Sequence, residues 1–213
     1  MIYLDHNPTI PVVPEVLETM MPFFREERGN PSSSYRFGSR LKKVIETARE
    51  QVAVLIGAHP LEILFTSGGT ESVPLVAGLG MAVDIARKKS PAFEGKVRPL
   101  RDALENGILT AIPQTELNGH PALRLAKTTN ITFHGIESEA LLLLLDQAGI
   151  CASSGSACLA DSPDPSHVVA AMKPGSAARQ CVRFSLGVEN AKAQIREALN
   201  TIRSSAAMLG NAG

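Results

Sequence analysis

The chain has 213 residues, of which 44% are hydrophobic and 20% charged, and its 21 basic residues balance its 21 acidic ones. This is the composition of a globular protein with one core and room for a second small domain. A net charge of zero argues against nucleic acid or an acidic membrane as a partner held by bulk electrostatics, and the longest apolar run, residues 140–145, is too short to span a bilayer.

The first third of the chain predicts two strands and two helices. Residues 2–4 form a short apolar run that ends at a turn, which predicts a strand. Residues 14–24 suit a helix with a proline in its first turn. Apolar residues recur at i, i+3, i+4 and i+7 spacing over residues 41–55, which predicts a long amphipathic helix capped by Gly57. Residues 62–66 then favour a strand.

A turn at residues 67–70 leads into the next expected helix, over residues 71–86, with an acidic residue in its first turn. Pro74, Gly78 and Gly80 lower the helix propensity inside this segment. We expect the helix to continue through all three.

The rest of the chain alternates helices and strands. Residues 91–106 predict a charged surface helix, and residues 137–147 a short, strongly apolar one. Strands are expected at residues 115–118, 130–133, 150–153 and 181–186. The C-terminal helix buries a stripe made of Ile195, Leu199, Ile202, Ala206 and Leu209. This alternation predicts an α/β or α+β fold with a small mixed sheet.

The N-terminus and the cysteines favour a cytoplasmic location. Residues 1–5 lack the basic and apolar regions of a signal peptide. Three cysteines, an odd number, do not make a disulfide framework.

Three segments carry motifs. Residues 3–9 read Tyr-Leu-Asp-His-Asn-Pro-Thr, and residues 29–33 read Gly-Asn-Pro-Ser-Ser. Residues 63–71 read Ile-Leu-Phe-Thr-Ser-Gly-Gly-Thr-Glu, a turn before a helix whose unpaired N–H groups can bind an anion. Residues 153–158 read Ser-Ser-Gly-Ser-Ala-Cys, and Pro-Ser-His-Val and Val-Arg-Phe-Ser-Leu-Gly follow further on. Together these segments resemble the NifS/IscS-type cysteine desulfurases, class V aminotransferases with the fold of type I pyridoxal 5′-phosphate (PLP) enzymes.

The resemblance implies an activity and a set of site residues. Cys158 would be the nucleophile that takes sulfur from L-cysteine as a persulfide, on an exposed Ser/Gly-rich loop. Arg183 would bind the substrate carboxylate through its planar fork, and Asn30 would also contact the substrate. Gly69 and Thr70 would hold the phosphate of PLP. The persulfide would serve iron–sulfur cluster assembly or tRNA thiolation through an acceptor or scaffold protein, and the chain would form a homodimer.

Simpler interpretations stand beside these roles. A lone cysteine is more often a small buried apolar residue, which is how we interpret Cys151 and Cys181 in their strands. The alternative for Arg183 is a surface ion pair. The five histidines show no metal-ligand spacing, so no metal site is expected, and His167 most simply begins a helix.

The lysine that the resemblance requires is missing. PLP chemistry needs a lysine that forms a Schiff base with the cofactor and then moves protons, and in the family this lysine follows a histidine. The chain has eight lysines, none of which follows a histidine: Lys42, Lys43, Lys88, Lys89, Lys96, Lys127, Lys173 and Lys192. We therefore expect no covalent PLP binding and no activity from the isolated chain.

The missing part has a recognisable edge. Family members carry a Gly-Thr-Glu-like string twice, once before and once after the lysine. Here the residues before Gly69 match the context of the first string, and the residues up to Gly80 match the context of the second. A deletion of domain size, roughly 100–200 residues, that fused the two strings in register explains both matches. His6, Pro8 and Ile10 also depart from the family's opening motif.

The resemblance therefore predicts three parts. Residues 1–70 form an N-terminal remnant, residues 71–90 a fusion helix, and residues 91–213 the small C-terminal domain with the cysteine loop. The chain is then a cysteine desulfurase-like protein that is inactive alone. The alternatives are a non-catalytic persulfide relay or scaffold fragment, and a product of a gene deletion.

Overall fold

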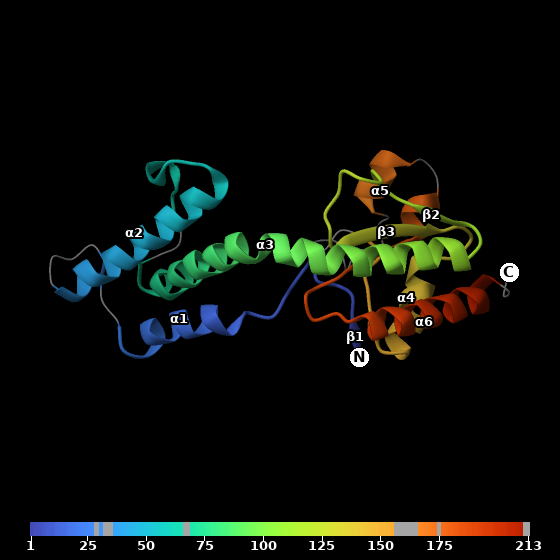
Figure 1. Ribbon diagram of the computed structural model, residues 1–213, viewed down its shortest axis with the longest axis horizontal. Coiled ribbons are helices and arrows are strands. Elements are labelled where there is room, and N and C mark those ends of the chain that lie inside the picture. Colours follow the sequence, from blue (N-terminus) through green and yellow to red (C-terminus); the bar gives the residue numbers. More distant parts are fainter. Residues whose placement is uncertain (28–29, 32–35, 66–68, 156–165, 174–175, 211–213) are drawn as a thin grey trace. The chain divides into compact units, whose positions relative to one another are not determined.

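The computed structural model describes residues 1–27, 30–31, 36–65, 69–155, 166–173 and 176–210 (Figure 1). The chain divides into two compact units. The sheet unit contains Met1–Ile10 and Ala92–Gly213, and the helical unit contains Pro11–Pro91. Residues 1–10, which we predicted as part of an N-terminal remnant, thus pack with the C-terminal part of the chain. The division into an N-terminal remnant, a fusion helix and a small C-terminal domain stays a prediction.

The sheet unit is built around two small sheets. An antiparallel sheet has the order β2 (Thr115–Leu117), β3 (Thr128–Phe133) and β5 (Cys181–Ser185). A parallel pair joins β1 (Ile2–Tyr3) to β4 (Ile150–Cys151). These strands lie at the predicted places and confirm the mixed α/β class.

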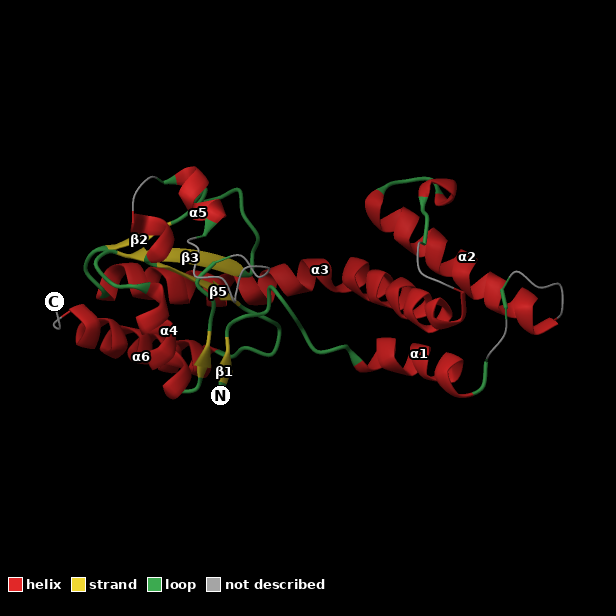
Figure 2. Cartoon of the chain, turned by 180° about the vertical axis from the view of Figure 1, so that it is seen from behind, coloured by secondary structure: helices red, strands yellow, loops and turns green. Residues whose placement is uncertain are grey.

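Helices cover these strands. Helix α4 (Ser138–Gln147) packs on α6 (Lys192–Gly210) and on β5, and in Figure 2 both helices lie on the same side of the three-stranded sheet. The short helix α5 (His167–Met172) begins at the predicted residue and is capped by the Ser166 hydroxyl, which accepts from the backbone N–H of Val169. A 3-10 helix, Ser176–Arg179, precedes β5.

Helix α3 (Gly69–Ala111) is longer than predicted, because it unites the two helices expected at residues 71–86 and 91–106. The prediction of a charged surface helix over residues 91–106 is incomplete. Val97, Leu100 and Leu104 recur at i, i+3 and i+7 and are buried in the core of the sheet unit. One face of this segment is charged and the other is apolar, as in any helix that packs on a core.

The main core of the sheet unit is one cluster to which both chain ends contribute, and a smaller cluster contains Val169 and Cys181. The main core contains Ile2 and Leu4 from the N-terminus, Phe133 and Phe184 from the sheet, and the stripe of α6. The predicted stripe is confirmed: Ile195, Ile202 and Ala206 are buried, and Leu199 and Leu209 pack against the cluster.

A buried carboxylate is held beside this core. Glu105 on α3 accepts hydrogen bonds from Arg124 and from the Thr129 hydroxyl, the latter at 2.6 Å. Burial alone would raise the pKa of the Glu105 carboxyl, but these hydrogen bonds and the charges of Arg124 and Arg101 outweigh it and hold the pKa below its ordinary value. Glu105 is therefore a paired, ionised part of the native structure.

The helical unit contains α1 (Pro14–Arg25), α2 (Arg36–Ile56), a 3-10 helix η1 (Pro60–Glu62) and the first part of α3. The predicted cap at Gly57 is confirmed. Gly57 has φ +69°, and the N–H of Ala58 donates to the carbonyl of Ala53 at 2.9 Å. This is the left-handed turn and the six-residue hydrogen bond with which many helices end.

The strand predicted at residues 62–66 is wrong for the part that the structure describes. Residues 60–62 form η1 instead, and residues 63–65 have no regular structure. The carbonyl of Ile63 accepts from Arg49 rather than from a strand, and Arg49 also lies over the Phe65 ring, 5.1 Å from its centroid. Apolar composition favours a strand only where a second strand offers its hydrogen bonds, and the described residues of the helical unit offer none.

Two glycines explain why α3 tolerates residues with low helix propensity. A Cβ at Gly80 would lie 2.9 Å from the backbone Cα of Ala48 on α2, and one at Gly78 would lie 2.5 Å from the Met20 sulfur on α1. The missing side chains let α1 and α2 approach α3 closely. Close packing thus offsets a helix propensity that is about 1 kcal/mol poorer per glycine than alanine.

Candidate functional site

Arg183, the predicted carboxylate-binding residue, lies on β5 in the interior of the sheet unit. This residue is 8% exposed. The alternative of a surface ion pair is right about the pairing, which is with Asp5, but wrong about the surface. One guanidinium nitrogen, Nη2, lies 3.0 Å from Oδ1 of Asp5. The other, Nη1, donates to the carbonyl oxygen of Gly155, three residues before Cys158. Arg183 therefore ties the N-terminal segment to the start of the cysteine-bearing segment.

The backbone fixes this arrangement. An antiparallel bridge pairs Arg183 with Ser153, and the Arg183 N–H donates to the Ser153 carbonyl at 2.7 Å. A parallel bridge pairs Asp5 with Ser185. The Asp5 side chain is bound on both oxygens, because Oδ2 also accepts from the Ser153 hydroxyl at 2.6 Å. The sequence predicted Asp5 only as the residue at which a strand ends. A carboxylate directly after an apolar strand could have indicated that this side chain pairs with a basic residue.

Lys127 and His6 lie beside these residues. We call the group of Asp5, His6, Lys127, Ser153 and Arg183 the corner of the sheet unit. The Lys127 ammonium donates to the carbonyl oxygen of His6 at 2.9 Å. Burial and, after it, the positive charge of Arg183 lower the pKa of the Lys127 amine. The buried His6 ring meets Tyr3 edge-on with centroids 4.9 Å apart. Gly187 makes room for His6, because a Cβ at Gly187 would lie 2.5 Å from the His6 ring.

The corner holds charges of both signs. Arg183 and Lys127 are positive, Asp5 is paired with Arg183, and the Glu189 carboxylate lies next to the His6 ring at Gly187. Nε of Arg183 and Nε2 of His6 are buried without a hydrogen-bond partner among the described residues. Each Nη atom of Arg183 already has one partner, Gly155 or Asp5, and Nε–H is the donor that is left for a further acceptor.

The other predicted site residues lie outside the described part of the sheet unit. Cys158 lies outside the described residues. Gly69 and Thr70 begin α3 in the helical unit. Asn30 is exposed in the connection between α1 and α2. Arg183 is thus the predicted site residue whose surroundings the structure defines.

The two other cysteines differ in environment. Cys181 is fully buried on β5, its thiol lies 3.2 Å from the Ser154 carbonyl oxygen, and burial raises the pKa of this thiol. This confirms the interpretation of Cys181 as a structural residue. Cys151 on β4 is half-buried. Within the described residues, no group of three or more histidine, cysteine or acidic side chains could hold a metal ion.

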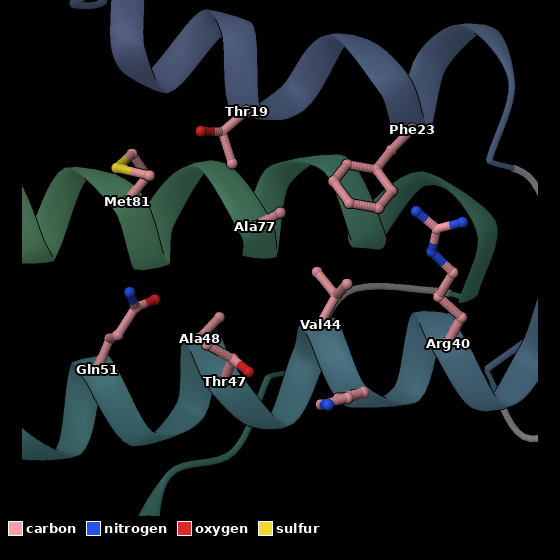
Figure 3. Close-up of a pocket in the computed structure, with 10 residues that line it drawn as sticks. Thr19, Phe23, Arg40, Val44, Thr47, Ala48, Gln51, Ala77 and Met81 are labelled. Carbon is pink, nitrogen blue, oxygen red and sulfur yellow. The ribbon is translucent and has the colours of Figure 1, made fainter.

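The helical unit contains a hollow of about 410 Å³ between its three helices (Figure 3). Phe23 of α1, Val44 of α2 and Ala77 and Met81 of α3 give it a mainly apolar wall. Arg40 also lines it and is paired with Glu27 at 2.7 Å. The described residues that line this hollow include neither Arg183 nor Asn30.

The profile of the aminotransferase class-V family matches this chain twice, over residues 2–90 and over residues 73–198. The chain belongs to this family, whose members depend on PLP. Both matches include residues 73–90, which begin two residues after Glu71 of the Gly69-Thr70-Glu71 string. A fusion of two similar strings produces such an overlap.

Within the family the chain is similar to cysteine desulfurases, as predicted. It is 45% identical over 147 residues to cysteine desulfurase 2 of Trichormus variabilis, covering 68% of this chain and 36% of the relative. It is 43% identical over 144 residues to NifS of Azotobacter vinelandii, covering 67% of this chain and 36% of the relative. The chain spans about a third of the length of these relatives.

A longer alignment displays the internal gap. The cysteine desulfurase of Trichormus azollae aligns over 359 positions at 27% identity, with 91% of this chain and 90% of the relative covered. A chain of 213 residues leaves at least 146 of these positions, the difference between the two lengths, without a counterpart. The predicted internal deletion accounts for this difference.

Solved structures support the fold. A NifS-like protein has a TM-score of 0.82 at 16% identity, covering 97% of this chain and 99% of that one. A NifS-like protein of Rickettsia africae has a TM-score of 0.76 at 16% identity, covering 96% of this chain and 99% of that one. Within the described residues, none of the helices combines the length and apolarity that crossing a bilayer needs.

The described residues around Arg183 do not fit PLP. Lys127 is the lysine beside Arg183, but its amine is bound to the His6 carbonyl. The nearby carboxylate, Asp5, is bound on both oxygens and is not free to pair with a pyridinium nitrogen. Tyr3 meets the His6 ring edge-on. The corner around Arg183 thus lacks the donor set that the cofactor requires.

Proposed function

We propose that this chain is a cysteine desulfurase-like protein that does not release sulfur from L-cysteine on its own. The observation that carries the proposal is the occupied corner at Arg183: its fork is held by Asp5 and Gly155, and the neighbouring amine of Lys127 is held by a backbone carbonyl. A cytoplasmic location, a homo-oligomeric state and contact with an iron–sulfur scaffold protein are part of the same proposal.

The test measures products and adducts separately. The purified chain is incubated with PLP and L-cysteine, alanine is quantified, and borohydride is added to trap any Schiff base for peptide mapping. An intact desulfurase serves as the positive control. We expect neither alanine above background nor an adduct enriched at one lysine. Alanine formation together with a single reducible adduct, at Lys127 above all, would overturn the proposal.

A second function, persulfide acceptance by Cys158, is favoured by the environment of Cys181. Because Cys181 is fully buried and its thiol has a raised pKa, it is a poor acceptor. In the transfer, the Cys158 thiolate attacks the terminal sulfur of a donor enzyme's persulfide. The donor's S–S bond breaks and its thiolate leaves, so the step needs no added oxidant or reductant.

Radioactive sulfur distinguishes the acceptor from the other cysteines. An intact desulfurase charged with labelled L-cysteine is mixed with the wild-type chain, with Cys158→Ser and, as the matched control, with Cys151→Ser. We expect label on the wild-type chain and on Cys151→Ser and none on Cys158→Ser. Equal labelling of the three proteins, or no labelling at all, rejects the relay and leaves the product of a gene deletion as the interpretation.

A further inference from the structure

The hollow of the helical unit follows one stripe of α2 (Figure 3). The α2 residues that line it recur at helical spacing: Arg40, Lys43, Val44, Thr47, Ala48 and Gln51. The axis of α2 rises by about 16 Å between the first and the last of these residues. The other two helices each contribute a pair of residues four positions apart: Thr19 and Phe23 of α1, and Ala77 and Met81 of α3. The hollow is therefore elongated, and its length suits an extended chain.

The wall of this hollow offers partly exposed apolar surface. Phe23, Val44 and Met81 are each only half-buried, and in Figure 3 they extend from three different helices into the space between them. Ala48 and Ala77 keep the middle open because their side chains are small. Water in such a space finds few hydrogen-bond partners, so an apolar occupant displaces it favourably.

The two ends of the hollow differ in charge. Arg40 and Lys43 lie at the end nearer the start of α2, and the described residues that line the hollow include no acidic one. Glu27 balances Arg40 at 2.7 Å, which leaves the charge of Lys43. Gln51 and Met81, at the opposite end, carry no charge. An elongated site with a positive end and an uncharged, mainly apolar remainder is complementary to an amphipathic anion.

We propose that this hollow binds an aliphatic carboxylate of medium chain length. The tail lies along Phe23, Val44 and Met81, and the carboxylate lies at Lys43 and Arg40. Because Arg40 is already paired, Lys43 supplies most of the attraction for the carboxylate. A volume of about 410 Å³ falls in the lower part of the roughly 300–1,000 Å³ that small-molecule pockets occupy, which favours a small ligand over a protein segment. The site uses none of the residues on which the proposed function depends, so it adds a binding activity to that function.

Nuclear magnetic resonance of the full chain, labelled with ¹³C at its methionine methyl groups, tests the proposal. The chain is titrated with decanoate below the concentration at which decanoate forms micelles, and in parallel with decanol, which has the same tail length without the charge. We expect the Met81 methyl signal to shift and to reach saturation with decanoate. The Met172 methyl, half-exposed on α5 of the sheet unit, is the internal control and should not shift. Decanol should bind about fivefold more weakly, because it lacks an ion pair with Lys43.

Two variants change the charge and the volume of the hollow. Lys43→Glu replaces attraction by repulsion and should weaken decanoate binding about tenfold, while decanol binding stays unchanged. Its matched control is Lys42→Glu, which makes the same change of charge at a neighbouring α2 residue outside the lining. This control should bind decanoate within about twofold of wild type, because salt screens the more distant charge. Thr47→Phe fills the hollow from an exposed position of α2 and should weaken the binding of both ligands about tenfold.

Several results would overturn the proposal once circular dichroism shows that each protein is folded. The Met81 methyl does not respond to decanoate, or the Met172 methyl responds equally, as it would to a detergent. Decanol binds as tightly as decanoate, which assigns the hollow to uncharged apolar ligands. Lys42→Glu weakens binding as much as Lys43→Glu, or Thr47→Phe binds as wild type does, which places the ligand outside the hollow. The readout is ligand binding, so these results do not depend on whether the chain releases sulfur from L-cysteine.

Discussion

Replacement of Gly80 by alanine tests whether α3 and α2 are in close backbone contact. A Cβ at position 80 would lie 2.8 Å from the Ala48 Cβ and 2.9 Å from its Cα, distances at which the helices must move apart. Overpacking of this kind costs about 1–3 kcal/mol. The substitution also gains up to about 1 kcal/mol of helix propensity, so we expect Gly80→Ala to be neutral to about 2 kcal/mol less stable than wild type.

Two further variants separate these contributions. A Cβ at Gly95, on the same helix, meets no atom within 4 Å, so Gly95→Ala should show the propensity gain alone. A Cβ at Gly78 would meet the Met20 side chain, which can rotate away, so Gly78→Ala should fall between the other two. Urea unfolding followed by helical circular dichroism measures all three, with equal m-values required for the comparison. A Gly80→Ala protein as stable as Gly95→Ala would refute the close contact of α2 and α3.

Three other predictions address the sheet unit. The Glu105 carboxyl has a lower pKa in the folded chain than in the unfolded chain, so its contribution to the free energy of unfolding is complete at neutral pH and is lost as pH falls below about 5. When stability is measured against pH in the acid range, Glu105→Gln should lose less stability than wild type. An unchanged dependence on pH would contradict the pairing. Ile202→Ala should destabilise by about 2–4 kcal/mol because Ile202 is fully buried, whereas Leu143→Ala, at an exposed residue, should change stability by less than about 0.5 kcal/mol; denaturant unfolding compares the two. With a thiol reagent at neutral pH, the buried Cys181 should react at least tenfold more slowly than Cys151, and mass spectrometry of timed samples would show equal rates if the burial were wrong.

The features that sequence predicted well are local ones. Helix periodicity depends on neighbours three and four residues apart, so the stripe of α6 and the existence of α2 could be read directly, although α2 begins five residues before the predicted start. The left-handed cap at Gly57 likewise needs only its own short segment. The family resemblance was also predicted correctly, because it depended on contiguous motifs.

The features that sequence missed depend on distant partners. A strand at residues 62–66 requires a second strand, and the described part of the helical unit has none to offer. The Asp5–Arg183 ion pair joins residues 178 positions apart, which no spacing rule could bring together. The apolar stripe of Val97, Leu100 and Leu104 was visible at helical spacing, but the many charges between these residues concealed it.

The pairing of the first strand with the fourth and of Asp5 with β5 has a consequence for biosynthesis. The long-range hydrogen bonds of Met1–Ile10 are made with residues from 121 to 187 positions later, such as Lys127, Ser153 and Arg183. Residues 11–91 instead find their contacts within one continuous stretch, so this part can fold while the ribosome is still adding the remainder. The leading ten residues must wait, unpaired, until nearly the whole polypeptide has emerged.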